Sequence, residues 1–209
     1  MQDALGRNKR GFWLKHLHRW HWISAALALI GMLLFAVTGI TLDHAADIGA
    51  SPTTATHDAQ MPAQLLQALP ETGEKEEQAP LPEPVRQWLK SEFGVDAGAR
   101  QADWTADELY LALPRPGGDA WVSIDRATGE AQYERTDRGW ISYFNDLHKG
   151  RNAGAAWSWF IDIFAGVCIV FTVTGLVLLQ FHARQRPTTW PLVGAGLVIP
   201  ALIAILLIH

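Results

Sequence analysis

Three stretches of the chain contain almost no charged residue, and they constrain the fold more than any other feature. They span residues 20–42, 163–181 and 188–208. Each is about as long as the run of roughly 20 apolar residues that a helix needs to cross a bilayer. Three such runs in 209 residues exceed what the core of a small soluble domain could cover. We therefore predict transmembrane helices at residues 20–43, 153–182 and 189–208.

Basic residues flank these helices unevenly and predict the orientation. The first helix is preceded by Arg7, Lys9, Arg10, Lys15 and Arg19, and the loop 183–188 contains Arg184 and Arg186. Under the positive-inside rule, residues 1–19 and this loop are cytoplasmic, whereas residues 44–148 and the C-terminus lie outside. The first apolar run is too long for a typical signal peptide, so we expect an uncleaved anchor.

The segment between the first two helices is predicted to form a small α+β domain. We expect residues 45–80, rich in Ala, Pro, Thr and Glu, to be loosely structured except for a short helix over 62–69. Pro near the start and Gly at the end predict a helix over 82–94. Alternation in ELYLALP, AWVSID and EAQYER predicts three antiparallel strands. The expected core residues are Trp88, Phe93, Leu109, Leu111, Trp121 and Val122.

The composition of this domain limits its partners. Acidic residues outnumber basic ones across residues 43–148. This balance argues against a nucleic-acid partner, because such a partner requires a basic face. The domain also lacks a nucleophile–base pair, so we expect a scaffold or a recognition domain.

A duplicated motif links the first two membrane helices. Residues 35–46 read FAVTGITLDHAA and residues 171–183 read FTVTGLVLLQFHA, so both contain F-x-V-T-G-x-x-L and reach a histidine. The V-T-G part is typical of close helix packing, because small residues allow helices to approach and a membrane Thr can hydrogen-bond. Each copy also has a distant L-H-basic forerunner, at 17–19 and 147–149. Because the two helices are antiparallel, each final histidine is expected beside the forerunner of the other copy.

The histidines are therefore expected in two groups. His18 or His21 would face His182 near the cytoplasmic side, and His44 would face His148 near the outer side. His18 and His21 are three residues apart on one helical face, so only one need be a ligand. The remaining histidines are interpreted as interfacial or surface residues; these are His16, His57 and His209.

Two imidazoles from facing helices are what a six-coordinate haem requires. The iron takes one axial nitrogen on each side, and the protein tunes it through the ligands and their surroundings. Zinc would need a third or fourth protein ligand nearby. Asp43 or Asp146 could supply one on the outer side, but no such cluster is evident on the inner side. We therefore predict one or two haem b groups. Their candidate ligands are His18, His21, His44, His148 and His182.

The distance between His21 and His44 complicates this prediction. His21 and His44 are about 34 Å apart along a straight helix at about 1.5 Å per residue, too far for rapid electron exchange between two haems without bending or intermediates.

Asp162 lies inside the second predicted helix, where acids usually face a partner or a water-filled cavity. It could serve as a proton relay, anchor a ligand histidine, or hydrogen-bond Ser158 or a nearby Trp.

Several motifs together resemble the PepSY-associated transmembrane helix family. They are LHRWHWISAALALIGMLLFAVTG, DLHKGRNAGAAWSW followed by FTVTGLVL, and the strand–turn segment AWVSIDRATGE, which resembles the PepSY module. The resemblance covers roughly residues 15–183. It implies a multi-pass protein of the bacterial inner membrane, similar to small relatives of haem-containing ferric-siderophore reductases. It also implies His18 (or His21), His44 and His148 as haem ligands, with His182 less directly supported.

These observations lead to a functional hypothesis with two alternatives. The first is a b-type haem protein that takes electrons from an external donor and passes them to an acceptor outside, such as ferric iron, a siderophore or a flavoprotein. It would be an electron-transfer component of a ferric reductase system, since the chain has no flavin or nicotinamide module. The alternatives are a non-catalytic, membrane-anchored PepSY module that binds or regulates a partner protein, and a transporter accessory subunit with a proton path through Asp162.

Overall fold

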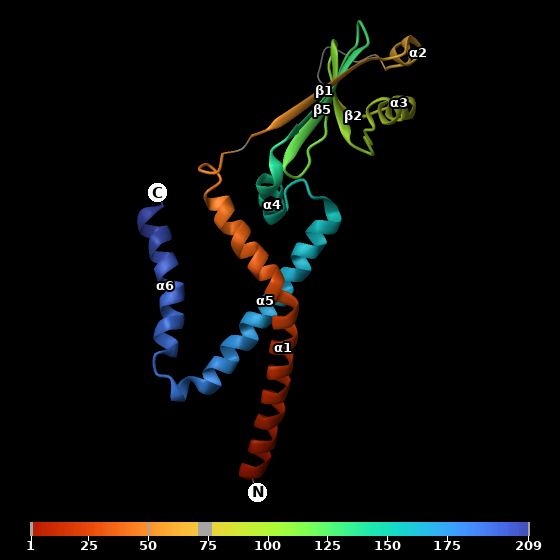
Figure 1. The fold of residues 1–209 in the computed structure, drawn as a ribbon. Helices are drawn as coiled ribbons and strands as arrows, with labels where there is room; N and C mark the ends of the chain where they lie inside the picture. Colours follow the sequence, from red (N-terminus) through yellow and green to blue (C-terminus); the bar gives the residue numbers. More distant parts are fainter. Residues whose placement is uncertain (1, 50, 71–76, 209) are drawn as a thin grey trace. The chain divides into compact units, whose positions relative to one another are not determined.

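The computed structural model describes residues 2–49, 51–70 and 77–208 of the chain (Figure 1). His209, which was not predicted to be a ligand, lies outside the described residues. The chain divides into two compact units, residues 1–34 with 159–209 and residues 35–158, and each is described by itself.

Three long helices carry the apolar runs. They are α1 (Gln2–Asp43), α5 (Gly154–His182) and α6 (Thr189–Leu207). A short 3-10 helix, η1 (Ala183–Gln185), follows α5. Three spans, Gly11–Asp43, Gly154–Gln185 and Thr189–Leu207, are long and apolar enough to cross a membrane. The chain is therefore a multi-pass membrane protein, and most large apolar side chains of these helices are exposed because lipid is their natural surrounding.

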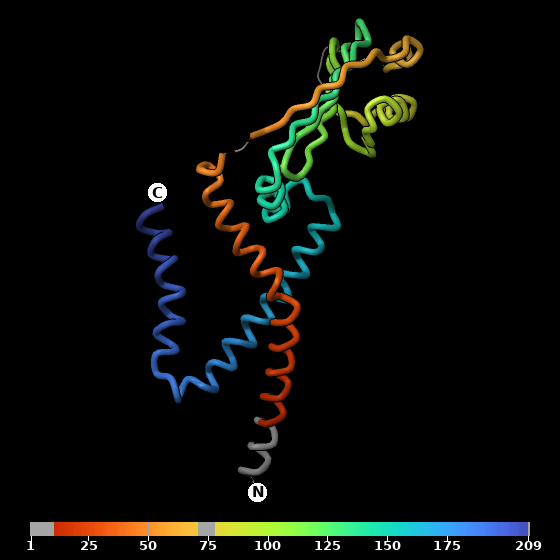
Figure 2. Tube along the Cα trace, in the orientation of Figure 1, coloured from red at the N-terminus to blue at the C-terminus, as the bar shows by residue number. Residues whose placement is uncertain are grey.

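A glycine permits close contact between α1 and α5, which cross in the trace of Figure 2. A Cβ atom added at Gly31 of α1 would overlap the ring of Phe164 on α5. Association of membrane helices depends on such close van der Waals packing, because lipid supplies no hydrophobic drive between helices. Gly31 thus allows α1 and α5 to pack closely.

We expect Gly31→Ala to destabilise the α1–α5 pair, because the added methyl group must displace the Phe164 ring. Overpacking of this kind costs about 1–3 kcal/mol. Unfolding in mixed micelles, followed by tryptophan fluorescence, measures the loss. Gly166→Ala is the matched control, since a Cβ atom there meets nothing within 4 Å. Equal effects of the two substitutions would contradict the assigned contact.

The second unit contains a six-stranded antiparallel sheet in the order β1-β6-β5-β4-β3-β2. Two helices of this unit, α2 and α3, follow β1 and β2 in the chain, and a third, α4, follows β6. The elements are β1 (Thr53–Gln60), α2 (Ala63–Gln67), β2 (Glu77–Pro80), α3 (Glu83–Phe93), β3 (Gln101–Trp104), β4 (Glu108–Ala112), β5 (Gly118–Asp125), β6 (Glu130–Asp137) and α4 (Gly139–Lys149).

Period-two alternation places one face of this sheet in a single core. In β5, Ala120, Val122 and Ile124 are buried while the residues between them are more exposed. Helix α3 contributes Val85 and Leu89 to the same cluster. The core also contains Met61, Leu81, Ala97, Ala102, Trp104, Leu109, Leu111 and Ala131.

Several sequence predictions for this region are confirmed and others are wrong. The short helix near 62–69, the helix near 82–94 and the three alternating strands are present. Residues 53–60 and 77–80 are not loose, because β1 pairs with β6 over eight residues and β2 pairs with β3. Residues 50 and 71–76 of the predicted loose segment lie outside the described residues. Polar strands such as TTATHDAQ carry no apolar alternation, so only their pairing reveals them.

The predicted core was wrong at one position and incomplete at another. Trp121 lies between the buried Ala120 and Val122, so it points to the opposite face and stacks on Tyr110, with ring centroids 6.1 Å apart. Trp104, which the sequence analysis did not select, is 1% exposed and donates its indole N–H to the Ala79 carbonyl at 3.1 Å. Helix α4 was also not predicted.

The turn between β5 and β6 is built around Asp125. Its carboxylate accepts backbone N–H groups from Thr128 at 2.7 Å and Ala127 at 2.9 Å, and Gly129 adopts a φ of +76°. The N–H of Thr128 is the first cause that holds the pKa of the Asp125 carboxyl below its ordinary value. The D-x-x-T-G sequence therefore specifies this hairpin.

Because the pKa of Asp125 is lowered in the folded state, its carboxylate stabilises the fold above the unfolded-state value of about 3.9. That contribution is lost as pH falls through the lower folded-state value. We expect Asp125→Asn to lower the thermal unfolding midpoint at pH 7, and the difference from wild type to vanish in strong acid. Glu130→Gln on the neighbouring strand end is the control. A pH-independent difference would contradict this assignment.

Candidate functional site

The duplicated F-x-V-T-G motif places three side-chain positions on one helical face. Residues i, i+3 and i+4 of a helix are neighbours on its surface. In the first copy these are Phe35, Thr38 and Gly39 of α1, which we call the Thr38 cluster. In the second copy they are Phe171, Thr174 and Gly175 of α5, which we call the Thr174 cluster.

The Thr174 cluster holds His21 of α1. The imidazole stacks on Phe171, with ring centroids 4.7 Å apart and planes 14° from parallel. Its Nδ1 lies 3.1 Å from Thr174 Oγ1 and 3.2 Å from the Phe171 carbonyl oxygen. A Cβ atom at Gly175 would come within 3.2 Å of His21 Cε1, so the glycine leaves space for the ring.

The Thr38 cluster holds His148 of α4 in the same manner. Nδ1 of His148 lies 2.7 Å from Thr38 Oγ1, and its ring packs against Phe35 at a centroid distance of 4.9 Å. A Cβ atom at Gly39 would lie 3.6 Å from His148 Cε1. Each copy of the motif therefore contacts one histidine from another helix through equivalent positions.

The hydrogen bonds fix the tautomer of both histidines. The Thr174 hydroxyl donates to the carbonyls of Val170 and Phe171, so its oxygen accepts from His21. The Phe171 carbonyl can only accept, which independently requires a proton on His21 Nδ1. Likewise, Thr38 donates to the Phe35 carbonyl and accepts from His148. When the ring is neutral, its Nε2 therefore carries a lone pair, the arrangement that metal-ligating histidines adopt.

The other three candidate histidines also carry the proton on Nδ1, because that nitrogen faces a backbone carbonyl in each ring. Nδ1 of His18, His44 and His182 lies 2.8–3.0 Å from the backbone carbonyl four residues earlier in its own helix. A carbonyl only accepts, so Nδ1 carries the proton in each ring. Across the described ranges 2–49, 51–70 and 77–208, no hydrogen bond reaches Nε2 of any of the five histidines.

His21 and His182 line one cavity of about 540 Å³. Arg186, Gln185 and Thr189 form a polar part of its wall, and the remaining wall is Gly175, Leu178 and Leu179. The predicted pairing of His21 with His182 thus corresponds to a shared cavity. His18 does not line it, and its side chain is bonded to Leu14 of its own helix.

His44 is less closely associated with His148 than the sequence suggested. Its side chain is 58% exposed, and its Nδ1 lies 3.7 Å from the Asp43 carboxylate. Within the part of the chain that the structure describes, no hydrogen bond or ring contact joins His44 to His148. The contacts of α4 with α1 instead involve Thr41, which donates to Asn145 Oδ1 at 2.7 Å, and Thr38.

Asp162 is exposed on α5 and has no hydrogen bond to any described residue. Ser158, one of the partners considered for it, donates to the Gly154 carbonyl instead. The structure therefore brings Asp162 to neither a histidine nor the serine.

Within the described part of the chain, protein side chains alone do not form a metal cluster. Among the described residues, no group of three or more His, Cys, Asp or Glu side chains could hold a metal ion. Paired histidines fit a cofactor that brings its own equatorial nitrogens better than they fit zinc.

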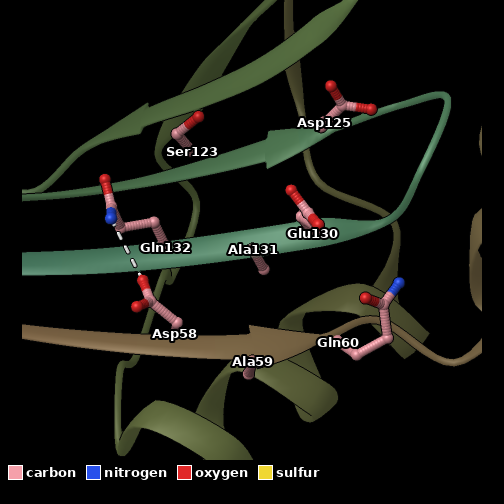
Figure 3. A pocket seen from close by; sticks show the side chains of 8 residues that line it. All are labelled: Asp58, Ala59, Gln60, Ser123, Asp125, Glu130, Ala131 and Gln132. Atoms are coloured by element: carbon pink, nitrogen blue, oxygen red, sulfur yellow. Dashed lines mark hydrogen bonds between the residues drawn. The ribbon is translucent and has the colours of Figure 1, made fainter.

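A shallow groove of about 660 Å³ lies over the edge of the sheet formed by β1, β5 and β6 (Figure 3). Gln132 donates to Asp58 across it at 3.0 Å. Its other lining residues include Ser123, Asp125 and Glu130, and it contains none of the predicted ligands.

The sequence profile of the PepSY_TM-like family matches residues 12–209. The chain belongs to the PepSY_TM-like family. The match spans all three membrane helices and the sheet between α1 and α4 in chain order, so the resemblance inferred from separated motifs is confirmed at the level of family. No curated protein and no solved structure matches the chain.

The sequence predicted close packing and hydrogen bonding by the V-T-G repeat of this PepSY_TM-like protein, and Thr38 and Thr174 do each accept a hydrogen bond from a histidine of another helix. It did not predict that the repeated Phe, Thr and Gly each contact that histidine. The shared spacing of i, i+3 and i+4 was the available signal. It indicates a common face, but it does not name the residue that the face contacts.

We expect Thr174→Val to weaken the contact between α1 and α5, because the isosteric side chain cannot accept the His21 hydrogen bond. Interhelical hydrogen bonds in membranes contribute about 0.5–2 kcal/mol. Unfolding in mixed micelles measures the loss. Thr172→Val, at an exposed position two residues away, is the control. A larger effect at Thr172 would contradict the assigned bond.

Proposed function

We propose that this PepSY_TM-like protein binds haem b and transfers electrons across the bacterial inner membrane. The observation that carries the proposal is the cavity shared by His21 and His182, two histidines from different helices whose Nε2 atoms have no hydrogen bond to any described residue. The resemblance to haem-containing reductases motivates the choice of cofactor, and the family match supports the membrane architecture.

The residues of this cavity fit a haem group in three respects. Its volume of about 540 Å³ falls in the usual range for ligand sites, roughly 300–1,000 Å³. Leu178, Leu179 and Gly175 supply an apolar wall for the macrocycle. Arg186 supplies a cation that would pair with a propionate, and Arg binds carboxylates well through its planar guanidinium.

When bound, haem would supply one-electron chemistry that no side chain here provides. The chain's own residues orient the ligands. Thr174 and Phe171 hold the His21 ring through Nδ1 and by stacking, which fixes the direction of Nε2. The Leu178 carbonyl does the same for His182. A hydrogen bond at Nδ1 also raises the basicity of the ligating nitrogen.

The Thr38 cluster and His148 offer a second position. His148 is held as His21 is, and His44 is the ligand proposed opposite it. Because His44 is exposed, we expect weaker binding there than at the His21–His182 pair. The two positions belong to the outer and inner ends of the membrane helices in the proposed orientation.

In this orientation the N-terminus and the loop 183–188 are cytoplasmic, and the sheet domain and the C-terminus are periplasmic. The domain is then a PepSY-like module inserted between the first two membrane helices. A cytoplasmic donor would deliver electrons near His21 and His182. The acceptor would be periplasmic, with ferric iron, a ferric siderophore or a flavoprotein as the candidate classes.

Reduced-minus-oxidised spectra of the purified protein, expressed with sufficient haem, test the proposal. We expect α and Soret bands of low-spin haem b in wild type and loss of at least half of the haem in His21→Ala and in His182→Ala. His57→Ala, in β1 of the sheet, is the control and should retain full haem content.

Absence of bands from wild type would overturn the haem proposal and favour the alternative of a membrane-anchored module that binds a partner protein. Bands that persist in His21→Ala but disappear in His18→Ala would show that the wrong residue of this helix was assigned.

A further inference from the structure

Helix α4 has a polar face on which each side chain has a partner within the second unit. The Asp146 carboxylate accepts the backbone N–H of Gly117 at 2.9 Å, which ties α4 to the loop before β5. Asn145 exchanges hydrogen bonds with Thr41 of α1, and His148 bonds Thr38. Asn145 and Asp146 are 6% and 8% exposed. This face therefore connects the sheet to the last turns of α1.

The remaining surface of α4 is apolar and exposed. Trp140 is 76% exposed, and Ile141, Tyr143 and Phe144 are 44%, 37% and 47% exposed. The three aromatic rings contact one another, with centroids 5.6–6.3 Å apart, and so form a continuous patch. A patch of this size on a helix indicates a surface that is covered in the native environment.

The contacts of α4 set its depth relative to the bilayer. Thr38 and Thr41 lie in the last two turns of the candidate membrane span Gly11–Asp43. Helix α4 also ends at Lys149, and only residues 150–153 separate it from Gly154, where α5 and the next span begin. Both constraints place α4 where apolar membrane helices end, which is the headgroup region of a bilayer.

We propose that α4 is an interfacial helix whose aromatic patch inserts between lipid headgroups. Trp and Tyr concentrate at this level of membranes, because their rings are apolar and their N–H and O–H groups remain near water. Lys149 and Arg151 are exposed at the C-terminal end of α4 and would contact lipid phosphates. The bilayer that surrounds α1 and α5 would thus also cover the patch.

This arrangement gives α4 a further role. The helix that carries His148 would be held on one side by α1 and on the other by lipid, so the sheet domain could not rotate freely about residues 150–153. The inference requires no cofactor and stands independently of the haem proposal.

Spin labelling of the full chain in phosphatidylcholine–phosphatidylglycerol nanodiscs tests the inference. The background is Cys168→Ser, because Cys168 is the only cysteine of the chain. Nitroxides are attached at Trp140→Cys and Phe144→Cys, with Thr54→Cys on the exposed part of β1 as the control. Accessibility to oxygen, which enters lipid, is compared with accessibility to a water-soluble nickel chelate.

We expect the two α4 labels to be at least threefold more accessible to oxygen relative to nickel than the Thr54 label. Equal ratios at all three sites would overturn the proposal, because the patch would then face water. Low accessibility to both reagents at α4 would overturn it in another way, since protein would cover the patch. Spin–spin broadening in that case would identify a second copy of the chain as the cover.

Discussion

A hydrogen bond from histidine Nδ1 to a threonine oxygen of a facing helix organises both compact units. In one unit it joins His21 to Thr174, and in the other it joins His148 to Thr38. A polar ring in apolar surroundings requires such a partner, because unsatisfied polar groups are costly there. The same bond determines which nitrogen of the ring remains available to a ligand. Packing and chemistry thus depend on one contact at each copy of the motif.

The two copies differ in what surrounds that contact. His21 shares a cavity with His182, and Arg186 lies on its wall. His148 belongs to α4, a helix with an aromatic patch and a buried Asp146 that reaches the sheet. The two copies therefore hold a histidine in the same way but differ in their surroundings. This difference is the reason that we propose the His21–His182 pair as the first haem site.

The sequence predicted features that depend on local pattern. Apolar runs predicted three membrane helices, and strict alternation predicted β4, β5 and β6. It failed where structure depends on pairing at a distance, as in β1, whose polar residues become a strand only against β6. Trp121 was assigned to the core from its size, whereas its position between two inward residues excludes it.

The same distinction applies to the site. The histidines were proposed as candidate ligands from their positions at helix ends, but the choice between His18 and His21 depended on the facing helix. Only the structure shows that His21 meets Thr174, while His18 bonds its own backbone. The shared face of Phe, Thr and Gly could have been derived from helical periodicity, but its histidine could not.

Both units depend on two threonines that fix the histidine tautomer with the proton on Nδ1. Nitrogen-15 NMR of the full chain, prepared without haem and labelled at histidine, tests this tautomer, with His21→Asn and His148→Asn used for assignment. We expect protonated Nδ1 and unprotonated Nε2 for both rings at a pH where they are neutral. Protonated Nε2 at either position would contradict it.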